Sequence, residues 1–313
     1  QNVAVGAYAL DANTTAGDNT AVGYQALTSN TTGDVNTAVG YKALYTNVDG
    51  DRSTAVGSQA LYTQDPASNG DMYNTAVGYS AGYAITTATH NTLIGGLAGD
   101  ALTTGASNVA VGYGALTTED VGQHNVAIGR DALSAQNTAS AANIYNTAVG
   151  SSAGAAITTG ASNTLIGGVA GDAITTGGNN VAVGYTSLGV NTTGSGNVAI
   201  GDYSLDANTT AAYNTAVGYA ALGANTTGTT NVAVGKSSLL LNTTGGGNTA
   251  VGSAALDAAT TADGNTAVGV NAGSAVTTGA SNTAVGQNAL LLNTTGTMNA
   301  VLGNHALDAN TTG

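Results

Sequence analysis

A 17-residue repeat constrains this chain more than any other feature of its sequence. An Asn-x-Ala-Val-Gly core, or a close variant, begins each repeat, and residues 19–33 (NTAVGYQALTSNTTG) are typical. Fifteen of the seventeen spacings between successive cores are 17 residues, and the other two are 21. A fixed short period with rare insertions is typical of a solenoid, in which each repeat forms one coil. The cores begin at residues 2, 19, 36, 53, 74, 91, 108, 125, 146, 163, 180, 197, 214, 231, 248, 265, 282 and 299.

Each coil is numbered here from the first residue of its core. Position 1 is Asn in every coil except at Ser53, and position 4, as at Val22, is always Val, Ile or Leu. Position 5 is Gly in all eighteen coils, as at Gly23, which indicates a left-handed backbone angle or a close backbone approach. The short apolar segment before this glycine leaves no room for a helix. Two short strands joined by tight turns fit each coil best.

The pattern therefore predicts an all-β fold, a parallel β-solenoid of eighteen coils that spans residues 1–313 as a single domain. Stacked strands lie ~4.8 Å apart, so eighteen coils would form a rod of roughly 85 Å. The two 21-residue spacings predict four-residue insertions near residues 64–73 and 136–145. Insertions in solenoids form surface loops, where functions other than scaffolding concentrate.

One exchange between positions 9 and 12 indicates how the core is filled. In thirteen coils position 9 is Leu, as at Leu27, and position 12 is polar, as at Asn30, with Ala259 the one exception. In the other five coils position 9 is Gly and position 12 is a large apolar residue. A core at native density cannot hold two large side chains at one place or leave it empty, so both residues should reach the same volume. The five apolar residues are Ile85, Leu102, Ile157, Ile174 and Val276.

Stacking would align the recurring Asn and Thr residues in columns. Position 1 is Asn, and positions 12 to 14 are commonly Asn-Thr-Thr, as in residues 13–15 and 225–227. Stacked amides and hydroxyls hydrogen-bond to one another or to turn backbone. The same triplets are N-glycosylation sequons, but structural ladders explain them without a glycan.

Composition excludes several classes of protein. Four Lys and Arg stand against seventeen Asp and Glu, a net charge of −13, which argues against nucleic acid and anionic membrane surfaces as partners. The chain has no Cys, Phe or Trp, so its core must be thin and built from Ala, Val and Leu. No apolar run approaches the ~20 residues of a membrane span. The chain opens and closes inside a repeat without a starting Met, which predicts a processed product or a segment of a longer protein.

Candidate chemistry is sparse. The three histidines, His90, His124 and His305, lie in different coils without metal-binding spacing, so we expect no enzyme activity. Tyrosines that recur at position 6 could stack on sugars or simply cover a thin sheet; they are Tyr24, Tyr41, Tyr79, Tyr113, Tyr185 and Tyr219. Acidic turn residues could supply oxygen ligands to calcium, although they match no complete calcium-binding motif and solvated turn acids are the alternative. These candidates are Asp49, Asp51, Asp65, Asn69 and Asp71.

The Asn-x-Ala-Val/Ile-Gly core followed by an Ala/Ser segment resembles the head repeats of trimeric autotransporter adhesins, which form a left-handed parallel β-roll. The fuller pattern NTAVGYQAL with NTTG more closely resembles repeats of phage and marine-virus tail fibres and related bacterial surface proteins. The period of 17 departs from the shorter adhesin-head repeat, which leaves the coil cross-section open. The resemblance implies a trimeric, extracellular, fibrous protein. Neither the membrane anchor of the autotransporters nor the C-terminal chaperone domain of tail fibres is recognisable.

Three functions follow as hypotheses. The first is the structural shaft of an extracellular fibre, from a phage tail or a cell surface, that projects a tip for a glycan or receptor. Each coil offers little apolar area against an ordering cost of ~1–2 kcal/mol per residue, so three packed copies would bury more. The second is a self-assembling filament subunit whose coil ends stack. The third is an ice- or glycan-binding solenoid that uses the Thr columns at positions 13 and 14.

The exchange between positions 9 and 12 predicts a rescue. Leu27→Gly should leave a cavity and cost about 2–5 kcal/mol of unfolding free energy. Adding Asn30→Ile should restore part of that loss, because the new side chain reaches the emptied volume. Thermal unfolding of the two variants measures the effect. The shared-volume hypothesis is wrong if the double variant melts no higher than the single one.

Overall fold

The computed structural model describes residues 1–66, 68–138, 140 and 142–313. All strands and turns in these residues belong to parallel β-solenoid coils, so the predicted fold class is confirmed. The chain divides into two compact units, residues 1–159 (unit 1) and 160–313 (unit 2). That they continue as one domain stays a prediction. Ala67, Ala139 and Ala141, within the two predicted insertions, lie outside the described residues.

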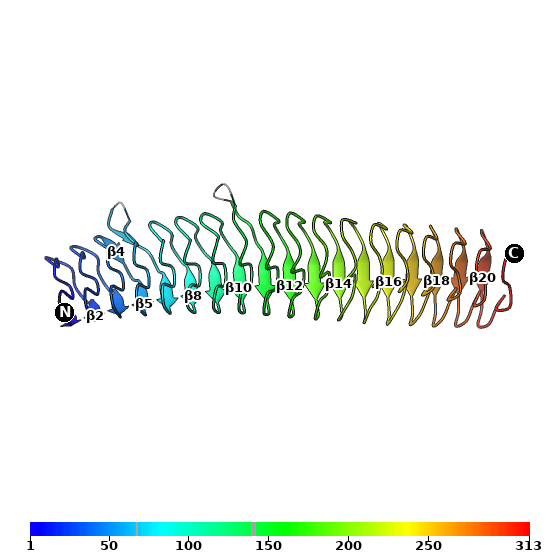
Figure 1. Ribbon diagram of the computed structural model, residues 1–313, viewed down its shortest axis with the longest axis horizontal. Coiled ribbons are helices and arrows are strands. Elements are labelled where there is room, and N and C mark those ends of the chain that lie inside the picture. Colours follow the sequence, from blue (N-terminus) through cyan, green and yellow to red (C-terminus); the bar gives the residue numbers. More distant parts are fainter. Residues whose placement is uncertain (67, 139, 141) are drawn as a thin grey trace. The chain divides into compact units, whose positions relative to one another are not determined.

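In unit 1, successive three-residue strands pair in parallel and in register, and they lie side by side in Figure 1. Each residue faces the same position of the next coil, as Ala21 faces Ala38. The insertions do not disturb this register, since Thr54 pairs with Thr75 across 21 residues. The strands are β1 (Val3–Val5), β2 (Thr20–Val22), β3 (Thr37–Val39), β5 (Thr54–Val56), β7 (Thr75–Val77), β8 (Thr92–Ile94), β9 (Val109–Val111), β10 (Val126–Ile128) and β11 (Thr147–Val149).

Beside the first insertion, the two-residue strands β4 (Gly50–Asp51) and β6 (Gly70–Asp71) pair with each other. At the second insertion, an isolated bridge joins Gln123 and Asn143 in the same way. Both insertions therefore rejoin the stack at the end of their coil, which is why the following core resumes in register.

Unit 2 repeats the arrangement with no insertion, and its strands pair in the same parallel register. They are β12 (Thr164–Ile166), β13 (Val181–Val183), β14 (Val198–Ile200), β15 (Thr215–Val217), β16 (Val232–Val234), β17 (Thr249–Val251), β18 (Thr266–Val268), β19 (Thr283–Val285) and β20 (Ala300–Leu302). In both units the Ala at position 3 points into the core, while positions 2 and 4 point outward.

The expected second strand of each regular coil does not form. Positions 7, 9 and 17 adopt positive φ angles, as at Gln25 (55°), Leu27 (52°) and Val35 (60°), and such angles interrupt an extended strand. Their N–H groups are still satisfied by neighbouring coils: Gln25 N donates to Ala7 O (3.0 Å) and Leu27 N to Ala43 O (3.0 Å). Bonds between coils on both sides thus hold a backbone conformation that costs each residue about 1–2 kcal/mol.

The glycine at position 5 has both of the features that its strict recurrence indicated, a positive φ angle and a close approach to a neighbouring backbone. Gly23 has φ 136°, and a Cβ placed there would lie 2.5 Å from the carbonyl oxygen of Gly40 in the next coil. Gly218 repeats this in unit 2, with φ 133° and Gly235 O at 2.6 Å. The coils stack so closely here that no side chain fits.

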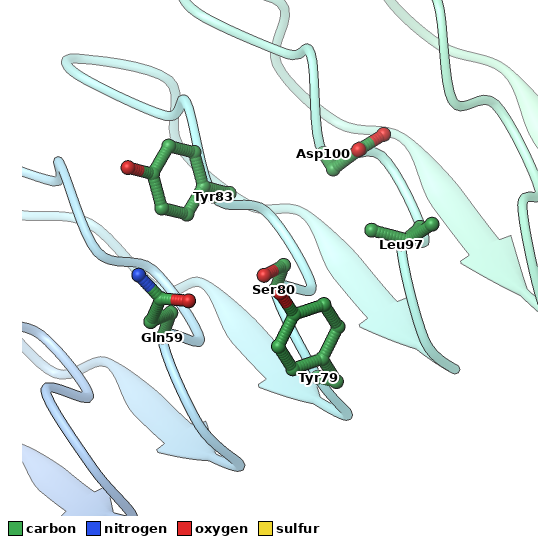
Figure 2. Close-up of a pocket in the computed structure, with 6 residues that line it drawn as sticks. All are labelled: Gln59, Tyr79, Ser80, Tyr83, Leu97 and Asp100. Carbon is green, nitrogen blue, oxygen red and sulfur yellow. The ribbon is translucent and has the colours of Figure 1, made fainter.

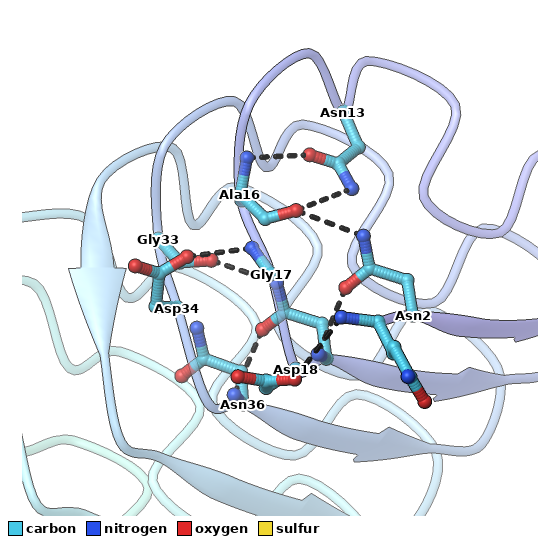
Figure 3. Close-up of polar contacts among 10 residues, drawn as sticks. Asn2, Asn13, Ala16, Gly17, Asp18, Gly33, Asp34 and Asn36 are labelled. Carbon is cyan, nitrogen blue, oxygen red and sulfur yellow. Dashed lines mark hydrogen bonds and ion pairs between the residues drawn. The ribbon is translucent and has the colours of Figure 1, made fainter.

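Buried asparagines form the predicted ladders. Figure 3 shows Asn2 and Asn13 both donating to the carbonyl oxygen of Ala16, at 2.8 and 3.2 Å. The other end of the Asn2 side chain accepts a hydrogen bond from the N–H of Asn19 in the next coil (2.9 Å). Position 12 also stacks, since Asn225 Nδ2 donates to Asn208 Oδ1 at 3.1 Å. Asn225 has no exposed surface, so this sequon is closed to a glycan on the folded chain.

The glycines at position 9 show how the core accommodates the exchange with position 12. A Cβ on Gly82 would lie 3.2 Å from Ile85 Cδ1 of its own coil and 2.9 Å from Leu61 Cδ2 of the preceding coil. It would also lie 2.7 Å from Leu93 Cδ1, so the larger residue at position 3 of the following coil helps to fill this volume. All five apolar residues at position 12 are fully buried, as are Leu27 and Asn30.

The close approach at position 5 predicts a severe cost for a single methyl group. Gly218→Ala should lower the unfolding free energy by about 3 kcal/mol or more, because it combines backbone strain with steric overlap. Gly247→Ala is the matched control, since no atom lies within 4 Å of a Cβ there and Ser281 and Met298 adopt the same φ at position 17. The control should cost only about 1 kcal/mol. Equal denaturation midpoints for the two variants would contradict the packing argument.

Candidate functional site

Four of the five calcium candidates, the aspartates, contact other protein groups around the first insertion. Turn N–H groups or hydroxyls donate hydrogen bonds to Asp49, Asp51 and Asp65. Asp71 forms an ion pair with Arg52, and the side chain of Asn69 is exposed. Among the described residues, no three His, Cys, Asp or Glu side chains are grouped so that they could hold a metal ion. These acids instead stabilise the turns beside the first insertion.

The three histidines also lie apart, each against a neighbour in an adjacent coil. The ring of His90 packs on Tyr73 with centroids 5.2 Å apart, and that of His124 stacks on Tyr145 at 5.3 Å. In unit 2, His305 hydrogen-bonds Asn288 (3.2 Å) and forms an ion pair with Asp308 in its own coil (3.0 Å). All three adopt positive φ angles, which identifies them as turn residues.

Each insertion is anchored by a buried Gln at position 12, where most other coils of this type carry Asn. Gln64 Nε2 donates to Ser53 Oγ (3.0 Å), and Gln64 Oε1 accepts from Asn74 in the next coil (2.9 Å). The longer Gln thus compensates for the shorter Ser at position 1. Gln136 at the second insertion likewise accepts from Asn146 (2.9 Å).

Glu119 supports the second insertion from the preceding coil. Its carboxylate is fully buried and accepts hydrogen bonds from Gly122 N (2.7 Å), Thr138 Oγ1 (2.9 Å) and Gln136 Nε2 (2.9 Å). A buried carboxylate is tolerated only when its oxygens are satisfied in this way. The signal in the sequence is a Glu at position 12, where most coils with Leu at position 9 carry Asn. The role of Glu119 was not predicted from it.

A tyrosine face, formed by positions 6, 7 and 10 of unit 1, carries most of the exposed aromatic surface of that unit. Tyr45, Tyr62 and Tyr83 occupy position 10 of three successive coils and stack with centroid distances of 5.0 Å. The tyrosines at position 6 were recognised as candidates from the sequence, whereas this ladder at position 10 was not predicted. Its signal was present as three tyrosines spaced by 17 and 21 residues.

Lys42 covers the beginning of the ladder. Its Nζ lies 4.9 Å from the ring centroid of Tyr45 and 5.4 Å from that of Tyr41. Desolvation acts to lower the pKa of Lys42, but the phenol groups of Tyr41, Tyr62 and Tyr45 outweigh it and the pKa is raised. The ammonium group therefore stays charged over the aromatic column at neutral pH.

A surface pocket of about 300 Å³ opens at the other end of this ladder, where Asp100 follows Tyr83 at position 10. Figure 2 shows its lining from three successive coils, with Ser80 lying between Tyr79 and Tyr83. The Ser80 hydroxyl has no hydrogen-bond partner within the described part of the chain, although the residue is only 7% exposed. The lining residues are Gln59, Tyr79, Ser80, Tyr83, Leu97 and Asp100.

Two further surfaces run along the coils. In unit 2, position 14 is an uninterrupted column of exposed Thr from Thr176 to Thr295. The Thr at position 13 is half-buried and donates a hydrogen bond to the next coil, as Thr209 Oγ1 does to Thr226 O (3.2 Å). In each unit, position 4 forms an outward apolar stripe. Its most exposed members are Val5, Val77, Ile94 and Ile128 in unit 1, and Ile166, Ile200, Val251, Val268 and Leu302 in unit 2.

No helix long and apolar enough to cross a membrane occurs in the described ranges. Searches for related proteins add no assignment, since no protein-family model and no curated sequence matches the chain. The surfaces described above therefore carry the functional argument.

The contacts of Glu119 predict a local structural role. Glu119→Ala should lower the unfolding free energy by about 3 kcal/mol, because it leaves several buried donors unsatisfied. Asp11→Ala is the matched control, since it removes the same charge from an exposed side chain and should change stability by less than about 0.5 kcal/mol. Chemical denaturation measures both values, and limited proteolysis should show faster cleavage near residue 140 in Glu119→Ala alone. Equal stability of the two variants would contradict the anchoring role.

Proposed function

We propose that the chain is the structural shaft of an extended extracellular fibre, formed by three copies, that projects a binding tip. The observation that carries the proposal is the outward apolar stripe at position 4. Because the strands pair in register, its Val and Ile side chains recur at the strand spacing of ~4.8 Å along each unit. A contiguous apolar surface of this kind indicates a protein partner.

Charge favours a second and third copy of the same chain as that partner. Each copy carries a net charge of −13, so copies repel unless they meet through an uncharged face. Positions 2 and 4 of the strands hold only Thr, Val, Ile, Ala and Leu. They offer an uncharged contact surface, and burying it would add to the small apolar core of each coil. The likeness to tail-fibre and adhesin repeats supports both the trimer and the extracellular location.

Two alternatives use other surfaces. In a filament subunit, the strand edges of the end coils of successive copies would pair with each other. In an ice- or glycan-binding solenoid, the exposed Thr column of unit 2 would be the contact surface, and its regular exposure specifically favours this second candidate. A fibre shaft remains the better-supported proposal because each of the two units carries its own apolar stripe at position 4.

The mass of the chain in solution tests these functions. Light scattering during size exclusion should give three times the chain mass of 29.9 kDa. The double variant Ile166→Lys/Ile200→Lys should shift the mass towards one chain, because it places charges in the apolar stripe. The control, Thr193→Lys/Thr227→Lys, adds the same charge to the exposed Thr column and should remain trimeric.

A single-chain mass for the unmodified protein would contradict the trimeric shaft and favour the Thr-column function. Very large, heterogeneous species would instead favour the filament.

A further inference from the structure

We infer that the pocket at the end of the tyrosine ladder is a binding site for an uncharged or cationic saccharide. This inference is independent of the fibre proposal, because the pocket belongs to positions 6, 7 and 10 and not to the apolar stripe. Its volume of about 300 Å³ lies at the lower end of the roughly 300–1,000 Å³ range of small-molecule sites. A site of this size suits one sugar ring.

The aromatic part of the site arises because the column of stacked tyrosine rings ends at Tyr83. One face of the Tyr83 ring stacks on Tyr62, and position 10 of the next coil is Asp100, so no further ring continues the column. Tyr79 is 59% exposed, and its neighbours at position 6 are the small residues Ser58 and Gly96. Tyrosine rings present rigid apolar surface at low entropic cost, which suits the C–H face of a sugar.

The polar part of the site is arranged around these rings. Asp100 Oδ1 is held by the hydroxyl of Thr117 at 2.5 Å, while Asp100 Oδ2 has no hydrogen-bond partner among the described residues. The side chains of Ser80 and Gln59 are likewise unpaired within that part of the chain. A carboxylate, a hydroxyl and an amide together supply the acceptors and donors that sugar hydroxyls require. Groups of this kind beside an aromatic ring favour a polyhydroxylated ligand over a purely apolar one.

Charge limits the kind of saccharide. Asp100 faces the pocket, and none of the six lining residues is basic. An acidic sugar or a phosphate ester would meet repulsion from Asp100, with no cation among the lining residues to offset it. Neutral sugars and amino sugars are therefore the expected ligands.

The chain contains an internal comparison for this site. Residues 91–113 recur nearly unchanged at 163–185, an offset of 72 residues. The residues that correspond to Tyr79 and Tyr83 at this offset are Ser151 and Ala155. The second copy therefore lacks both rings, and the duplicated segment does not repeat the site.

Saccharide titration of the full chain tests the inference. The probes are methyl β-D-galactoside, methyl α-D-mannoside, N-acetylglucosamine, glucosamine and the acidic N-acetylneuraminic acid. Saturation-transfer NMR and intrinsic tyrosine fluorescence report binding, and the absence of Trp leaves the tyrosine signal unobscured. At least one neutral or amino sugar should bind with a dissociation constant on the order of 1 mM, and the acidic sugar should not.

Variants connect the binding to the pocket. Tyr83→Ala should weaken it about tenfold or more, and Asp100→Asn, which keeps the shape of the side chain, should weaken it severalfold. Tyr219→Ala is the control, since it removes an exposed tyrosine at position 6 of unit 2 and should leave binding unchanged. A melting curve for each variant separates lost binding from lost fold. The inference is overturned if none of the probes binds, or if binding survives both Tyr83→Ala and Asp100→Asn.

Discussion

The rest of the structure depends on the buried asparagine at position 1. Its amide donates to the turn of its own coil and accepts from the backbone of the next coil. Asn36 Nδ2 donates to Gly50 O (2.7 Å), and Asn36 Oδ1 accepts from Ser53 N (2.9 Å). Aspartate lacks the donor, and serine is too short to span both contacts. Hydrogen bonds of this kind hold each coil in register with the next, so the side chains in the core can stay small. This explains how a chain without Phe or Trp builds a regular core.

Features that repeat at every coil could be predicted from the sequence. The parallel solenoid follows from the period, the close approach at Gly23 from its strict recurrence, and the burial of Ile85 from its exchange with a Leu at position 9. The conformation of the remaining coil could not be predicted, because residues such as Leu27 rarely adopt positive φ. Only the hydrogen bonds to adjacent coils make that angle favourable, and these depend on the stacking itself. The candidate site escaped prediction for a related reason, since Tyr83 and Asp100 become neighbours only when position 10 is aligned between coils.

The insertions show how local exceptions remain compatible with the stack. Gln64 is one methylene longer than the Asn that position 12 usually carries in these coils, and its side chain reaches Asn74 of the next coil directly. At the second insertion the same substitution is supplemented by Glu119, whose carboxylate holds Gln136 and Thr138. Neither insertion shifts the following strand. The substitutions at position 12 therefore belong with the insertions as one structural change, although they lie outside the loop tips.

In a solenoid, a surface feature that continues from coil to coil suits a different kind of partner from a feature that ends at one coil. The apolar stripe at position 4 continues within each unit, so any partner that covers it must itself be long and regular, which a second copy of the chain is. The tyrosine ladder instead ends between Tyr83 and Asp100, and only at such an end does a ring keep a free face beside a carboxylate. Because the two surfaces occupy different positions of the coil, assembly through one leaves the other chemically intact. The proposed shaft would therefore bind its small ligand without altering the contacts that hold the coils together.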